Sequence, residues 1–179
     1  MAELTQEEKN LLGPIIKPFD RSDKSADKKK PKDGEIECDD FIEFIHIVNW
    51  DGEPPQHITL NMNEIASLTR NPLAFRENRT LYREKCFLWV IDSSFLKIIR
   101  EKTRNTKRTH DSEFVCHTNL TGWGEAYIGG ELFFGDDGNI YINYFSDRYG
   151  KPSDAQWQIA KQIFIRLGYQ NLIDILDLI

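Results

Sequence analysis

The 179-residue sequence lacks an apolar run near the roughly 20 residues that cross a bilayer. It has only three cysteines, Cys38, Cys86 and Cys116, and their odd number and wide spacing fit neither a disulfide framework nor a zinc site. The first residues are acidic and polar, without the basic start and apolar stretch of a secretion signal. These absences predict a cytoplasmic protein with no membrane span and with its thiols reduced and mostly buried.

The sequence also lacks an excess of positive charge. It has 23 Lys and Arg against 29 Asp and Glu, for a net charge of −6. Such a chain is repelled by polyphosphates, which disfavours nucleic acid as a partner. The local exception is a basic stretch that contains Arg100, Lys102, Arg104, Lys107 and Arg108. We interpret it as a solvated loop, with binding of a phosphate or an acidic partner as the alternative.

Common catalytic and cofactor motifs are missing as well. The chain has no Gly-x-Gly-x-x-Gly, P-loop, Gly-x-Ser-x-Gly or His-Glu-x-x-His pattern. The acidic residues of the segment 135–138 are too few and too closely spaced for a calcium loop. We therefore expect neither a metal nor a cofactor.

What is present is enough apolar surface for one folded unit, because 40% of the residues are hydrophobic and 12% are aromatic. A short helix is predicted over residues 4–12, capped by Thr5 and stopped by Gly13. A charged, lysine- and aspartate-rich linker follows. The predicted organisation is an N-terminal helix and flexible linker over residues 1–35 and a single domain over residues 36–179.

The rest of the chain alternates between strand-like runs and turns. Strands are predicted over 36–50, 57–61, 86–91, 95–99, 114–117, 126–134 and 139–145. The Asp-Gly of segment 135–138 predicts a hairpin turn. Short helices are predicted over 64–69, capped by Asn63, and over 153–167, capped by Ser153 with Trp157 in its apolar stripe. The fold class is α+β, a mostly antiparallel β-meander of about five strands with a C-terminal helix packed on it.

Polar residues gather at the predicted strand ends between positions 117 and 150. We interpret them as a candidate pocket, because an imidazole titrates near neutrality and strand ends commonly line clefts. The candidate catalytic residues are His117, Glu131 and Tyr149, and the candidate binding residues are Asn119, Asn143, Ser146 and Arg148. The alternative is structural: a histidine that is hydrogen bonded in the core and a Ser-Asp-Arg-Tyr turn that only ends a strand.

Residues 81–170 resemble a domain of plant IQ-motif calmodulin-binding proteins and of bacterial polymorphic toxin tips. The resemblance is carried by the order of short motifs: Phe87-Leu88-Trp89-Val90-Ile91, His117-Thr118-Asn119-Leu120, Gly129-Gly130-Glu131-Leu132 and Asp137-Gly138-Asn139-Ile140. The family's Ser-Gly-His-Tyr-x-Pro signature is matched by Ser146-Asp147-Arg148-Tyr149 with Pro152 nearby. Here Asp147-Arg148 replaces Gly-His, and no IQ motif is apparent.

Two functions remain open from the sequence. The resemblance, the small size and the acidic charge indicate a cytoplasmic module that binds another protein in bacterial conflict or defence. The alternative is a small toxin-like effector enzyme that acts on a nucleotide-like substrate. It would catalyse hydrolysis or a transfer like that of an ADP-ribosyltransferase, with its site around His117.

Overall fold

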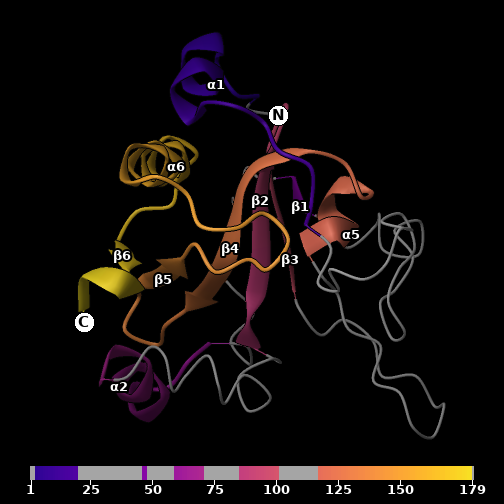
Figure 1. Cartoon of the computed structure of the whole chain (residues 1–179). Helices are drawn as coiled ribbons and strands as arrows, with labels where there is room; N and C mark the ends of the chain where they lie inside the picture. The colour runs from indigo at the N-terminus through magenta and orange to yellow at the C-terminus, as the bar shows by residue number, and fades with distance from the viewer. Residues whose placement is uncertain (1–2, 20–45, 48–58, 71–84, 101–116, 179) are drawn as a thin grey trace, which may run out of the picture.

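The computed structural model describes residues 3–19, 46–47, 59–70, 85–100 and 117–178 (Figure 1). Cys38, Cys116 and the basic stretch beyond Arg100 lie outside these ranges, as does most of the strand predicted over 36–50. Cys86 is buried, as predicted. Among the described residues, none of the helices has both the length and the apolar character needed to pass through a membrane.

A mixed sheet of six strands, in the order β1-β3-β2-β4-β5-β6, forms the centre of the molecule. The strands are β1 (His46–Ile47), β2 (Phe87–Asp92), β3 (Leu96–Arg100), β4 (Ala126–Phe134), β5 (Ile140–Asn143) and β6 (Leu172–Asp174). The central strands β2 and β4 are almost wholly buried. This explains why their sequences are continuous apolar runs rather than alternating ones.

Two hairpins supply most of the antiparallel pairing. The β2–β3 turn is held by the Asp92 carboxylate, which accepts hydrogen bonds from the backbone N–H groups of Ser94 and Phe95, both at 2.8 Å. The β4–β5 turn ends at Gly138, which has a φ of 80°, a value that glycine adopts without strain. Both hairpins were predicted, and both are confirmed.

The predicted fold class is confirmed as α+β with a mostly antiparallel sheet, but the prediction of a simple meander is wrong. β2 pairs with β4, so β3 lies outside the sequential order, and β6 runs parallel to β5. A parallel neighbour requires a crossover. Helix α6 (Asp154–Arg166) provides the crossover. The sequence pattern of residues 171–179, which contain β6, does not specify the direction of pairing.

Helix α6 covers one face of the sheet. Ser153 caps it by accepting a hydrogen bond from the Gln156 N–H at 3.1 Å, as predicted. Its apolar stripe enters a core in which the Trp89 ring stacks on Trp157 at 6.1 Å and meets Phe164 edge-on at 5.0 Å. This confirms the predicted packing of the C-terminal helix on the sheet.

Helix α1 (Gln6–Leu12) lies beside α6 on the same side of the sheet (Figure 1). Thr5 and Glu8 form a reciprocal capping box at its start. Leu4 and Leu12 are buried in the same core as α6, so this helix belongs to the sheet domain. The predicted boundary near residue 35 lies outside the described residues.

Helix α5 (His117–Thr121) packs on the opposite face of the sheet. The sequence predicted a strand over 114–117, and at His117 that prediction is wrong. One turn of helix is too short to show a 3.6-residue period. The helix ends where Gly122 and Trp123 both adopt positive φ values, 61° and 63°.

Helix α2 (Met62–Arg70) and the 3-10 helix η5 (Ile175–Leu178) contact each other at the far end of the sheet. Helix α2 begins before the predicted 64–69, because Asn61 rather than Asn63 caps it and exchanges hydrogen bonds with Glu64. The strand predicted over 57–61 is described only at its end, where Leu60 forms a single bridge to Gly135.

Candidate functional site

All seven candidate site residues are buried, each at most 9% exposed. They are called the buried polar cluster: His117, Asn119, Glu131, Asn143, Ser146, Arg148 and Tyr149. Buried polar groups are costly unless they are hydrogen bonded. The partners of each side chain therefore decide what it can do.

Gly129 on β4 is the position at which His117 and Tyr149 approach the sheet. A Cβ atom at this position would lie 3.2 Å from the His117 ring and 3.3 Å from the Tyr149 ring. His117 comes from α5, whereas Tyr149 comes from the loop between β5 and α6. The missing side chain of Gly129 thus lets two aromatic groups from distant segments approach the same stretch of backbone.

His117 is anchored to the neighbouring residue of β4. Its Nε2 lies 2.8 Å from the carbonyl oxygen of Gly130. Because a carbonyl can only accept a hydrogen bond, Nε2 carries the proton and the tautomer is fixed. The predicted strands 114–117, 126–134 and 139–145 would place His117, Glu131 and Asn143 on three consecutive strands, and this is wrong for His117, which lies on α5.

Gly130 allows an equally close approach on the other face of β4. A Cβ atom here would lie 2.0 Å from the Asn143 carbonyl oxygen and 2.6 Å from the Trp89 ring. The Trp89 indole N–H donates to the Glu131 carbonyl at 3.1 Å. The Gly129-Gly130 pair is therefore explained by two close contacts, one on each side of the strand.

Glu131 and Asn143 form the second part of the cluster. They are direct partners across the β4–β5 ladder, so their side chains project from the same face. The Asn143 amide donates to the Glu131 carboxylate at 3.0 Å, and its carbonyl oxygen accepts from the Glu131 and Phe145 N–H groups. Asn143 therefore holds the carboxylate and the backbone beyond β5 at the same time.

Ser146 organises the turn that carries Arg148 and Tyr149. Its hydroxyl oxygen accepts hydrogen bonds from the N–H groups of Arg148 at 3.3 Å and Tyr149 at 3.2 Å. The turn closes when the Gly150 N–H donates to the Ser146 carbonyl at 3.0 Å. This local pattern is typical of a serine-initiated turn.

Tyr149 ties this turn to the end of α5. Its hydroxyl lies 2.9 Å from the Gly124 carbonyl, to which it donates, and 2.7 Å from the Thr121 hydroxyl. The sequence did not predict Thr121 or Gly124 as partners. The Gly122-Trp123-Gly124 break is visible in the sequence, but nothing in it points to a phenol 25 residues away.

Arg148 is the most buried cation of the cluster, at 1% exposure. Its Nη1 donates to the Phe19 carbonyl at 3.1 Å, and its guanidinium carbon lies 4.8 Å from the centre of the Trp123 ring. Phe19 is separated from Arg148 by 129 positions, which is why the sequence pattern missed this contact. The guanidinium therefore rests between a backbone carbonyl and an indole face.

The structure thus brings His117 and Tyr149 together at Gly129, pairs Glu131 with Asn143, and joins Ser146 to the backbone of Arg148 and Tyr149. Asn119 lies on α5, two positions after His117, and is 2% exposed. His117, Arg148 and Tyr149 donate to backbone carbonyls, and Ser146 accepts from backbone N–H groups. An arrangement of this kind fixes α5 and the 146–150 turn on the sheet.

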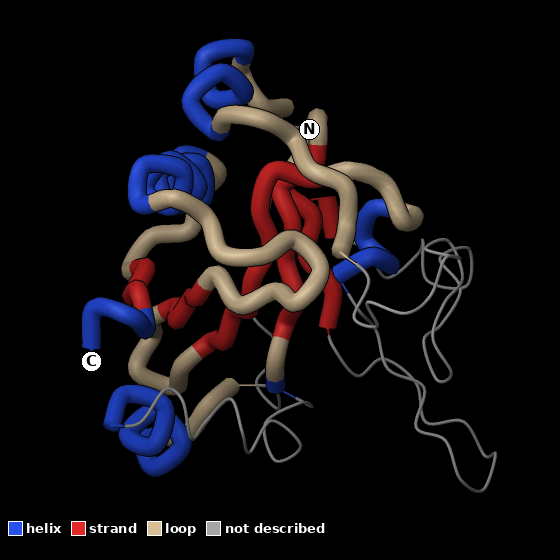
Figure 2. The backbone as a smooth tube through the Cα atoms, viewed as in Figure 1, coloured by secondary structure: helices blue, strands red, loops and turns tan. Residues whose placement is uncertain are grey.

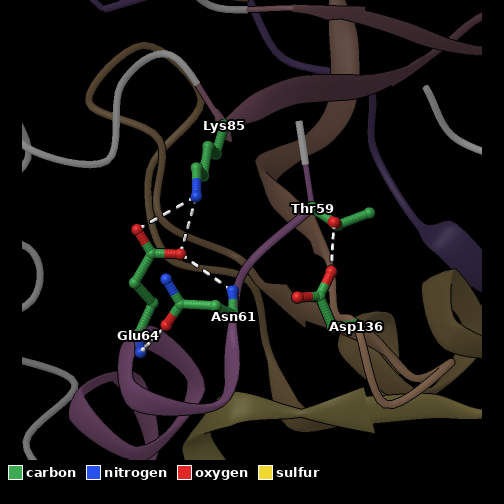
Figure 3. Close-up of polar contacts among 5 residues, drawn as sticks. All are labelled: Thr59, Asn61, Glu64, Lys85 and Asp136. Atoms are coloured by element: carbon green, nitrogen blue, oxygen red, sulfur yellow. Dashed lines mark hydrogen bonds and ion pairs between the residues drawn. The ribbon is translucent and has the colours of Figure 1, made fainter. Parts of the chain in front are cut away.

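A separate group of polar contacts lies at the start of β2 (Figure 3). The Lys85 ammonium contacts the Glu64 carboxylate at 2.8 Å and so attaches α2 to the sheet. Nearby, the Thr59 hydroxyl donates to Asp136 in the β4–β5 turn. Both contacts join segments that are distant in sequence, and both stabilise the end of the sheet opposite α1.

Within the same turn, the Asp137 carboxylate accepts hydrogen bonds from the Tyr141 hydroxyl at 2.5 Å and from Asn139 at 3.0 Å. Burial raises the pKa of Asp137, but these hydrogen bonds outweigh it and leave the pKa below its ordinary value. Burial and the bond to Asp137 together raise the pKa of Tyr141 to about 12.

Within the described ranges, the structure gathers no group of three or more His, Cys, Asp or Glu side chains able to hold a metal ion. The buried polar cluster offers a fixed histidine from α5, a carboxylate from β4, and a phenol and a guanidinium from the loop between β5 and α6. Comparisons with protein-family models, with curated proteins and with solved structures find no match to this chain. The resemblance to the IQ-motif and toxin-tip domain accordingly stays a prediction from the sequence.

Proposed function

We propose that the chain is a protein-interaction module that acts in the cytoplasm, in bacterial conflict or defence. The observation that carries the proposal is the surface of the paired helices α1 and α6. Leu11 on α1 is 51% exposed and Ile165 on α6 is 56% exposed. A single exposed leucine needs no explanation, but each helix of this packed pair exposes one large apolar side chain, and we take the two together as part of an interaction surface.

The helix pair is rigid enough to present such a surface. Arg166 on α6 makes an ion pair with Glu8 on α1 at 2.5 Å and also donates to the Glu3 carbonyl at 3.3 Å. Burial raises the pKa of Glu8, but the hydrogen bonds from Arg166 and Thr5 and the charge of Arg166 lower it by more, so the net pKa lies below its ordinary value. The two helices are therefore joined by charge as well as by the apolar core.

The exposed charges around this surface favour a basic partner. Glu3, Glu7 and Asp154 are exposed on or next to α1 and α6, and of the exposed basic residues there, Lys151 and Arg166, the second is already paired with Glu8. Acidic groups at the rim of an apolar contact attract a partner whose rim is basic and accelerate association. The net charge of −6 acts in the same direction. We accordingly propose a basic protein surface with an apolar centre as the partner.

The hydrogen bonds of the buried polar cluster support the same proposal. His117 donates to the Gly130 carbonyl, Tyr149 to the Gly124 carbonyl, and Ser146 accepts two backbone hydrogen bonds. Groups engaged in this way stabilise the fold. This supports the structural interpretation of these residues over a catalytic one.

Affinity capture from the source cells tests the proposal with three matched variants. Leu11→Glu and Ile165→Glu place a charge at the proposed surface, whereas Met62→Glu does so at a 62% exposed position on α2. We expect one basic partner at near 1:1 stoichiometry with the wild type and with Met62→Glu. Affinity measured by calorimetry should fall at least about tenfold with Ile165→Glu, because a buried unpaired charge costs several kcal/mol.

Circular dichroism of each variant separates loss of binding from loss of fold. If Ile165→Glu and Leu11→Glu bind the captured protein as tightly as the wild type does, the partner does not use this surface. Repeated capture without any stoichiometric partner contradicts the interaction module itself.

One observation favours the enzyme alternative. His117 and Tyr149 converge on the bare backbone of Gly129, and Glu131 lies two positions further along the same face of β4. A histidine, a phenol and a carboxylate in this arrangement are able to act on a nucleotide-like substrate. Expression toxicity that is abolished by Tyr149→Phe, which keeps the ring and removes only the hydroxyl, supports this alternative. Normal growth on strong expression, with no nucleotide turnover by the purified protein, contradicts it.

A further inference from the structure

Residues 14–19 form a segment, here called the strap, that runs from the end of α1 past the start of β4 (Figure 2). Ile16 exchanges two backbone hydrogen bonds with Ala126 at the start of β4, both at 3.0 Å. The Phe19 N–H donates to the Arg148 carbonyl at 2.6 Å, and the Phe19 carbonyl accepts from the Arg148 guanidinium at 3.1 Å. The strap therefore ends directly on Arg148.

Besides these hydrogen bonds, the partly buried Ile16 side chain packs against the core, but the rest of the strap is held weakly. Pro14 and Pro18 have no N–H to donate. The Phe19 side chain is 55% exposed, although its ring packs against Gly150. Segments with few buried apolar contacts and few backbone hydrogen bonds open locally at a free energy well below that of global unfolding. Apart from the Ile16 contact the strap has these properties, whereas the strands β2 and β4 beneath it are almost wholly buried.

The group under the strap is suited to bind an oxyanion. The Arg148 guanidinium at present donates to the Phe19 carbonyl, an acceptor that a carboxylate or phosphate oxygen replaces with a stronger, charge-assisted bond. The guanidinium carbon lies over the Trp123 ring, 4.8 Å from its centre, a contact that suits the planar arginine head group. Trp123 itself has a φ of 63°, a strained conformation for a bulky residue that persists only where the surroundings enforce it.

From these contacts we propose that the strap is a releasable cover and that its release uncovers an oxyanion-binding site made by Arg148 over Trp123. In the closed state the Phe19 carbonyl occupies the position of the anion. Strap and anion then compete for one cation, so that an anion shifts the chain toward the open state by its differential affinity. The proposal does not depend on whether the chain is an interaction module or an enzyme.

Two glycines provide a matched test. Gly150 has a φ of 71°, and a Cβ atom there would lie 2.9 Å from the Phe19 ring. Gly138 has a φ of 80°, but a Cβ atom there would meet nothing within 4 Å. Gly150→Ala and Gly138→Ala thus introduce the same backbone strain. Only Gly150→Ala pushes Phe19 away from Arg148.

Hydrogen exchange followed by NMR measures the release. In the wild type we expect the Ile16 and Phe19 amides to exchange at least about tenfold faster than those of Leu88 and Val90 in β2. Gly150→Ala should accelerate the strap amides by a further factor of about ten, and Gly138→Ala should leave them unchanged. Strap amides that exchange only as fast as those of β2 overturn the proposal. Phe19→Ala replaces Gly150→Ala if the latter does not fold.

Titration of each protein with acetate and with inorganic phosphate tests the site. We expect the Arg148 Nε–H and Trp123 indole N–H signals of Gly150→Ala to shift at lower anion concentration than those of Gly138→Ala. A response to both ions indicates a general oxyanion site, and a response to phosphate alone indicates a phosphate group as ligand. No response to either ion in Gly150→Ala overturns the proposed site, even if the strap opens.

Discussion

Neighbouring glycines in β4 have unequal roles, although the sequence presents them as a simple pair. A Cβ atom at Gly129 would lie 3.2–3.3 Å from the His117 and Tyr149 rings, which are able to adjust, and from the Trp89 carbonyl oxygen, a distance that a small shift relieves. Gly130 faces the Asn143 carbonyl and the Trp89 ring, and a backbone carbonyl in a sheet ladder is not able to move away. The same residue type is therefore tolerant of a methyl group at one position and intolerant at the next.

This difference predicts the effect of two alanine substitutions. Gly129→Ala should lower the free energy of unfolding by about 1–2 kcal/mol, because its neighbours give way by a few tenths of an ångström. Gly130→Ala should cost about 3 kcal/mol or more, or prevent folding, because its Cβ atom overlaps the backbone of β5. Urea denaturation of both variants measures the difference. Equal costs would show that the β4–β5 ladder shifts more easily than its hydrogen bonds indicate.

At the scale of elements, the sequence predicted those whose signals are local. The Thr5 and Ser153 caps, the Asp-Gly hairpin and the β2–β3 turn are each encoded within a few residues, and each is confirmed. The failures come from elements without a local signal. Helix α5 has a single turn, and β6 acquires its parallel direction only from the crossover through α6.

The candidate site shows the same division. The sequence identified polar residues that do lie together, because the Gly-Gly pair and the Ser146 turn have recognisable patterns. It did not identify Phe19 and Trp123, which contact Arg148 from other segments. Contacts that are made across the fold depend on tertiary packing, which periodicity and turn chemistry do not encode.

Tyr141 in the β4–β5 hairpin should make the stability of the protein depend on pH in the alkaline range. The folded state holds the phenolic proton of Tyr141 more tightly than the unfolded chain does, since its pKa is about 12 rather than 10.0. The resulting stabilisation is complete below pH 10 and is lost as the pH rises from 10 to 12. Tyr141→Phe should therefore cost about 1 kcal/mol at pH 8, where the hydrogen bond to Asp137 is intact.

The measurement is the free energy of unfolding of wild type and Tyr141→Phe across this range, obtained from urea denaturation. The difference between the two proteins should shrink steadily above pH 10. Tyr169, whose pKa is also raised by burial, is present in both and serves as an internal control. A difference that stays constant up to pH 12 contradicts the assignment of the shift to Tyr141.

At the scale of the whole molecule, helix α1 contributes to the same core as α6 and the sheet. Leu12 is 1% exposed and packs with the residues of α6 and the sheet, whereas Leu11 next to it is 51% exposed. Substituting each of these leucines in turn therefore separates the effect of losing a buried side chain from the effect of changing helix propensity.

Leu12→Ala should destabilise the entire protein by about 2–5 kcal/mol, through lost burial and the cavity left behind. Leu11→Ala should change stability by less than about 0.5 kcal/mol. Fluorescence of the core tryptophans during urea unfolding reports the global transition. If Leu12→Ala leaves that transition unchanged and only melts α1, the helix is an independent attachment and the single-core description is wrong.

The contact between α1 and α6 also has a consequence for the order in which the protein acquires its structure. Glu8 and Arg166 are separated by 158 positions, so α1 leaves the ribosome long before its partner exists. At the usual speed of translation, roughly 5–20 residues per second, the delay is on the order of 8–30 s. During that time Leu4 and Leu12 have no α6 to cover them. Helix α1 is thus made early and docked late, and in that interval a newly synthesised chain is open to chaperones, proteases and premature partners at this helix.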